Sequence, residues 1–175
     1  MKYFTKDLWA EMNQQDNSRT AKVKSQWCKN VKVYQKYLKR VLPDLPKQVQ
    51  NFFGKVSLHD GMLLSFSTGD KIKNRKRTVP TKNFAEIKIL EPNYKYIYTL
   101  LYSEVRKCMI DYPGESPLFL GEDWTYGDWG YDELYFTKDK WLCHEILFSS
   151  GATILLESKH FSYERKSSKA CLDRR

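Results

Sequence analysis

The residues best suited to chemistry lie in one acidic and aromatic segment, residues 111–133. Between Lys107 and Lys138 the chain has no lysine or arginine, while carboxylates and tryptophans crowd together: Glu122, Asp123, Trp124, Asp128, Trp129, Asp132 and Glu133. Two carboxylates beside apolar rings are typical of glycoside hydrolysis, which needs one carboxyl group with a raised pKa. A solvated acidic loop, anchored to the fold by its aromatic side chains, has the same composition. We therefore assign no catalytic residue and keep a carbohydrate-active enzyme as an alternative.

Metal binding is the second chemistry that the residue types allow. The candidate ligands are three histidines and four dispersed cysteines without a CxxC pair: His59, His144, His160, Cys28, Cys108, Cys143 and Cys171. We expect the last two strands to pair Phe148 with Thr153. In that register His144 lies opposite Glu157 and three residues from His160, about 10 Å along the strand, whereas zinc ligands lie about 2 Å from the metal. The sequence therefore predicts no metal, no cofactor and free thiols.

Basic residues form a second candidate site, for nucleic acid. The polar stretch at residues 73–77 supplies the predicted contacts, which are Lys73, Arg75, Lys76 and Arg77. A long basic helix face adds Lys22, Lys29, Lys32, Lys36 and Arg40. Basic grooves bind phosphates and aromatic faces stack on bases, but we expect the alternating tyrosines of residues 94–102 to pack in the core. No RRM, KH or zinc-finger signature is present, so this function is an alternative.

Length and charge limit the classes of protein to which the chain can belong. The chain has 175 residues and a formal net charge of +9. Residues 1–57 carry 12 Lys/Arg against 4 Asp/Glu, and residues 111–163 carry 3 against 10. The length fits one domain with its own core, and no apolar run approaches the length of a membrane span. We predict a single cytoplasmic domain that does not contact a membrane.

The elements that must position these residues fall into two blocks. Apolar residues at steps of three and four predict helices at residues 5–14, 19–42 and 46–54. Alternating patterns then predict strands at residues 62–67, 84–90, 94–103, 131–137, 141–148 and 152–161, with a loop at residues 73–77 and a turn at residues 149–151. The prediction is an α+β domain over residues 1–163, with N-terminal helices packed on a mostly antiparallel sheet that ends in a β-hairpin. Residues 164–175 are predicted to form a flexible basic tail.

Four segments carry a resemblance to a known family. The segments MKYFTKDLW, VSLHDGMLLSF, WGYDELYF and CHEILFSSGATILLESKHFSY occur in that order. They resemble an uncharacterised bacterial group, the domain-of-unknown-function family 4085, over residues 1–163. The resemblance implies a small cytoplasmic bacterial protein with helices against a sheet, and it implies no activity or catalytic residue. In size and in its HDG strand start the chain is also similar to immunity-type proteins encoded beside polymorphic toxins.

These observations favour a non-catalytic protein-binding module, of which an immunity-type inhibitor of a toxin is one form. Tyrosine and tryptophan anchor protein interfaces, and the unpaired acids beside them would orient a partner. The predicted protein-binding residues are Glu122, Asp123, Trp124, Tyr126, Asp128, Trp129, Tyr131 and Asp132. The sequence leaves the oligomeric state open.

Overall fold

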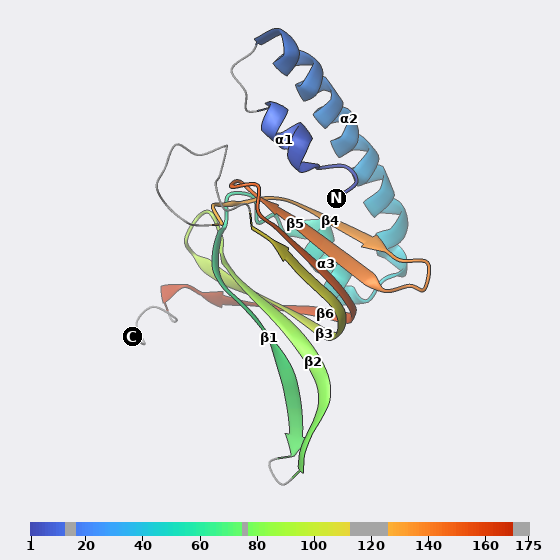
Figure 1. Cartoon of the computed structure of the whole chain (residues 1–175), viewed down its shortest axis with the longest axis vertical. Coiled ribbons are helices and arrows are strands. Elements are labelled where there is room, and N and C mark those ends of the chain that lie inside the picture. The colour runs from blue at the N-terminus through green and yellow to red at the C-terminus, as the bar shows by residue number, and fades with distance from the viewer. Residues whose placement is uncertain (13–16, 75–76, 113–125, 170–175) are drawn as a thin grey trace.

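A computed structural model describes residues 1–12, 17–74, 77–112 and 126–169, and for residues 17–20, 71–74 and 77–81 it describes the backbone only. Within these residues three α-helices precede six strands (Figure 1). The helices are α1 (Lys6–Met12), α2 (Asn17–Val41) and α3 (Lys47–Lys55), with a short 3-10 turn at Leu42–Asp44. The strands are β1 (Met62–Asn74), β2 (Arg77–Leu90), β3 (Tyr96–Asp111), β4 (Trp129–Phe136), β5 (Leu142–Phe148) and β6 (Thr153–Ser167). The predicted α+β class is confirmed.

The helical block follows the apolar spacing. On α2 the buried residues Val23, Trp27 and Tyr34 lie on one side, and the helix ends before Pro43, whose ring cannot continue it. α3 then packs its buried Val49 and Phe52 into the main core. The predicted helices are therefore confirmed, with ends shifted by one or two residues.

The sheet is antiparallel throughout and has the strand order β1-β2-β3-β6-β5-β4. Its two edge strands meet at one end, where the N–H of Asp60 donates to the carbonyl of Trp129 and the N–H of Trp129 donates to the carbonyl of Gly61, at 2.8 and 2.7 Å. A Cβ at position 61 would lie 2.8 Å from the carbonyl oxygen of Leu58, so only glycine permits this approach. The sheet is consequently curved and partly closed (Figure 1).

The β1–β2 hairpin is longer than predicted and forms an arm. The loop predicted at residues 73–77 is too long, since β1 continues to Asn74, which pairs with Arg77 at the start of β2; residues 75–76 lie outside the described chain. β2 pairs with β3 only between Phe84 and Leu90, so residues 77–83 have β1 alone as a strand partner. Figure 1 shows this two-stranded arm projecting away from the rest of the molecule.

The predicted register of the last hairpin is wrong by one residue. Thr153 pairs with Leu147, which places His144 opposite Leu156. The difference arises at the turn, where Phe148 bonds to Ala152 and Gly151 adopts a φ of 84°, so three residues form the loop. The end of the strand also differs from the prediction, because β6 continues beyond Tyr163 to Ser167. Only residues 170–175 of the predicted tail lie outside the described chain.

The tyrosine strand packs largely as expected. Tyr98, Leu100 and Tyr102 of β3 are buried in the main core, whereas Tyr94 precedes the strand and is 65% exposed. A second, smaller cluster of Phe4, Trp27 and Tyr34 joins the N-terminal segment and α2 to Tyr131 of β4.

One buried carboxylate holds the N-terminal segment in place. Glu133 of β4 is buried and accepts three backbone N–H groups, those of Lys2, Tyr3 and Phe4, at 2.8, 2.6 and 2.7 Å. These bonds replace the water that the charge loses on burial, and they set the path of the chain into α1. Glu133 is therefore structural, although the sequence placed it among the acidic candidates.

We expect Glu133→Gln to lower the free energy of unfolding by about 1–3 kcal/mol, because the new amide N–H₂ would face a backbone donor inside the fold. Urea denaturation followed by circular dichroism measures the change. Glu164→Gln is the matched control, since Glu164 pairs with Lys166 on the surface and such pairs contribute about 0–1 kcal/mol. Equal stability losses in the two variants would contradict the anchoring role.

Candidate functional site

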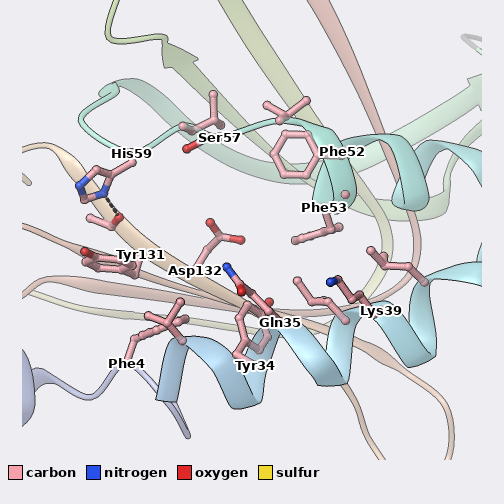
Figure 2. A pocket seen from close by; sticks show the side chains of 17 residues that line it. Phe4, Tyr34, Gln35, Lys39, Phe52, Phe53, Ser57, His59, Tyr131 and Asp132 are labelled. Atoms are coloured by element: carbon pink, nitrogen blue, oxygen red, sulfur yellow. Dashed lines mark hydrogen bonds between the residues drawn. The ribbon is translucent and has the colours of Figure 1, made fainter. Parts of the chain in front are cut away.

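A pocket of about 700 Å³ lies between α2, α3 and the start of β4. Aromatic rings form much of its wall, and a few polar side chains point into it (Figure 2). The rings are Phe4, Tyr34, Phe52, Phe53 and Tyr131, and the polar groups are Gln35, Lys39, Ser57, His59 and Asp132. This size, with apolar walls and few polar groups, is typical of ligand sites.

Asp132 is the only acidic residue among the described residues that line the pocket. Its side chain is 28% exposed, and two buried residues hold the carboxylate from the core side. Trp129 donates its indole N–H to Oδ1 and the His144 Nε2 lies against Oδ2, both at 3.2 Å. The carboxylate is thus held in one orientation with acceptor capacity left toward the pocket.

His144 connects Asp132 to the centre of the core. The ring is fully buried, and its Nδ1 lies 2.6 Å from the hydroxyl of Tyr102. Burial, followed by the nearby charge of Asp132, raises the pKa of Tyr102 well above 10, so the phenol keeps its proton. A neutral imidazole satisfies every group in this chain: the Tyr102 hydroxyl donates to Nδ1, and Nε2–H donates to Asp132.

The order of these three residues argues for positioning and against nucleophilic catalysis. In a Ser-His-Asp triad the carboxylate is buried and the hydroxyl faces the substrate. Here the hydroxyl of Tyr102 is buried and the carboxylate of Asp132 faces the pocket. The hydrogen bonds among Tyr102, His144 and Asp132 therefore orient an acceptor, and these three residues activate no nucleophile.

Tyr34 ties α2 to the strand that carries Asp132. Its hydroxyl accepts the backbone N–H of Leu134 at 2.6 Å. Burial is the main cause of a strongly raised Tyr34 pKa, and the charge of Asp132 adds to it. The hydroxyl thus stays neutral and α2 keeps a fixed distance from β4.

Tyr131 and His59 form the other side of the pocket (Figure 2). The rings are in contact at an angle of 49°, with centroids 4.9 Å apart, and the centroid of the Tyr131 ring also lies 4.7 Å from that of Trp27. His59 Nδ1 lies 2.5 Å from the carbonyl oxygen of Gly130, so Nδ1–H donates and the ring orientation is fixed. Next to it, Asp60 adds an exposed carboxylate.

The predicted protein-binding residues are only partly brought together. Tyr131 and Asp132 line the pocket, and Asp128 is exposed at the point where β1 meets β4. Trp129 is 1% exposed, so its ring belongs to the core, and Tyr126 packs against Tyr112 and Phe148. Three predicted residues lie outside the described chain: Glu122, Asp123 and Trp124. The contact surface as a whole stays a prediction.

The alternative sites have less to support them in the described residues. Lys73 and Arg77 lie on the arm with only their backbone described, and Arg75 and Lys76 lie outside the description. In the part of the chain that the structure covers, no group of three His, Cys, Asp or Glu side chains could hold a metal. Within the same part, the pocket offers one carboxylate where glycoside hydrolysis needs two.

Two further properties of the described residues bear on the sequence predictions. Three cysteines are free: Cys28, Cys108 and Cys143. Cys143 is buried and its pKa is raised to about 12, mainly by burial. Among the helices that the structure describes, none is long and apolar enough to cross a membrane.

Comparisons with known proteins found no matching family model, no matching curated protein and no matching solved structure. The resemblance drawn from the sequence therefore stays a prediction.

We expect Tyr102→Phe to lower the free energy of unfolding by about 1–3 kcal/mol, because Nδ1 of the buried His144 loses its donor. Urea denaturation measures this loss, and nitrogen NMR of the imidazole reports which ring nitrogen carries the proton. Tyr94→Phe is the control, since Tyr94 is exposed and its change should stay within about 0.5 kcal/mol. A wild-type His144 that carries its proton on Nδ1 and none on Nε2 would contradict the hydrogen-bond assignment above.

Proposed function

We propose that this protein is a non-catalytic, cytoplasmic binding module of a bacterium that recognises a protein partner by accepting a cationic side chain of that partner into the pocket. The observation that carries the proposal is the Asp132 carboxylate, held by Trp129 and His144 at an aromatic-walled pocket. A fixed acceptor among aromatic rings suits a guanidinium or an ammonium group. Arginine fits best, since its planar fork matches a carboxylate with both oxygens oriented.

The surroundings of Asp132 support a protein side chain as the occupant. Gln35 and Lys39 line the α2 side of the pocket and are exposed, so they can contact the backbone carbonyls or acids beside an inserted residue. Asp60 lies beside the pocket wall and adds a second negative charge for a basic partner. A buried charge pair with a polar surround is a recurrent anchor in protein interfaces.

An immunity-type inhibitor is the narrower form of this proposal. Such a protein would place its acidic and aromatic residues against a basic groove of a toxin, and the pocket would take one arginine from that groove. The support is the position of Tyr131 and Asp132, which belong both to the predicted contact residues and to the pocket lining.

Amide NMR titration with N-acetyl-arginine methylamide tests the proposal. We expect it to shift the signals of Tyr131, Asp132 and His59, and we expect the citrulline analogue, which has the same shape without the charge, to bind at least about tenfold more weakly, equivalent to about 1.4 kcal/mol. Asp132→Asn should remove the difference between the two probes.

Asp128→Asn is the matched control for Asp132→Asn, because it removes an equal charge from an exposed residue near the pocket. It should leave the preference for arginine unchanged. Equal binding of arginine and citrulline, or no shift with either probe, would refute a cation site. Shifts with the arginine probe that persist in Asp132→Asn would place the site elsewhere.

A further inference from the structure

Apart from Lys39, the basic residues of α2 do not line the proposed pocket and need their own explanation. Over 25 residues the helix contains eight Lys or Arg and no Asp or Glu. An ordinary exposed helix alternates the two signs, because acids and bases three or four residues apart attract each other. This helix lacks any such compensation along its own length.

Five of these residues form one face, which we call the basic ridge. They are Lys22, Lys29, Lys32, Lys36 and Arg40, and all five are exposed. At 3.6 residues per turn they lie opposite the buried Val23, Trp27 and Tyr34. The ridge extends about 27 Å at a rise of 1.5 Å per residue. Figure 1 shows α2 at the outside of the molecule, with its first half projecting beyond the sheet.

No carboxylate neutralises the ridge within the described residues. The ion pairs of that part of the chain join other elements, and none involves a ridge residue. Arg40 alone has a different contact, with its guanidinium 5.9 Å from the ring of Tyr37. Like charges three and four residues apart, as in Lys29, Lys32 and Lys36, destabilise a helix. A polyanion would remove that repulsion.

From this we infer that the basic ridge of α2 binds the phosphodiester backbone of a nucleic acid. A row of cations about 27 Å long matches a linear array of phosphates, which a compact anion does not present. The binding is expected to be independent of base sequence, because contacts to phosphates carry no sequence information. The inference goes beyond the proposed function and does not depend on the pocket.

A membrane surface is the other polyanion that a basic helix can bind. Interfacial helices insert an apolar face below the headgroups. The apolar face of α2 is occupied by its own fold, where Trp27 and Tyr34 pack against Phe4. On the ridge side the exposed apolar residue is Val33, at 51% exposure. Nucleic acid is therefore the favoured partner.

Fluorescence anisotropy with a labelled DNA duplex of about 16 base pairs, twice the ridge length at 3.4 Å per pair, tests the inference. An RNA hairpin serves as a second probe. We expect binding that weakens steeply with salt. The triple variant Lys29→Gln, Lys32→Gln, Lys36→Gln should weaken binding at least tenfold and reduce the slope of log K against log salt by about 2–3. Replacing the same lysines by arginine should restore it.

The control is Lys47→Gln, Lys95→Gln, Lys138→Gln, which removes the same charge from exposed sites outside α2. Thermal denaturation monitors the fold of every variant. Equal weakening by the two triple variants would reduce the effect to net charge and overturn the inference. So would binding that depends on Lys73 and Arg77 of the arm and not on the ridge, or binding to anionic phosphatidylserine vesicles without binding to either nucleic acid.

Discussion

The interaction on which the structure most depends is the pair of contacts that His144 makes across the core. A fully buried imidazole must have both nitrogens satisfied, and it finds Tyr102 on one side and Asp132 on the other. Rings from the helices and the sheet surround it, with Phe53 and Trp129 at centroid distances of 4.9 and 5.8 Å. Because these partners come from α3, β3 and β4, the correct placement of one polar side chain fixes how the helices, the sheet centre and the sheet edge fit together.

Glu133 is a second buried polar side chain that fixes how elements pack, because it ties the N-terminal segment to β4. Adjacent residues of β4 point to opposite faces, so Asp132 serves the core side while Glu133 receives the backbone of Lys2, Tyr3 and Phe4. Phe4 then packs on Trp27 and brings α2 against the strand. Strand alternation thus gives the two neighbouring carboxylates different roles. Glu133 anchors the N-terminal segment, and Asp132 contacts His144 and faces the pocket.

The sequence indicated the class and most elements, because the patterns that define them are local. Helices 5–14, 19–42 and 46–54 follow from apolar spacing, and the buried Tyr98 and Tyr102 follow from alternation. The pocket could not be predicted in this way. Its lining comes from the N-terminal segment, α2, α3, the residues before β1 and the start of β4, and no local pattern shows that these segments meet. The arm was missed for a related reason, since a run of charged residues is typical of a loop and equally compatible with a ribbon that no third strand covers.

The two-stranded arm exposes strand edges that could pair with another copy of the protein. Between residues 77 and 83 the arm has free backbone edges, and exposed edges are templates on which strands of other molecules can add. Pro80 lacks an N–H, and Asp70, Lys71, Lys73, Arg77 and Lys82 place charge along both strands. Each of these features opposes the docking of a second, identical edge. The charge of the arm therefore disfavours pairing between the open edges of two copies, and this effect needs no ligand.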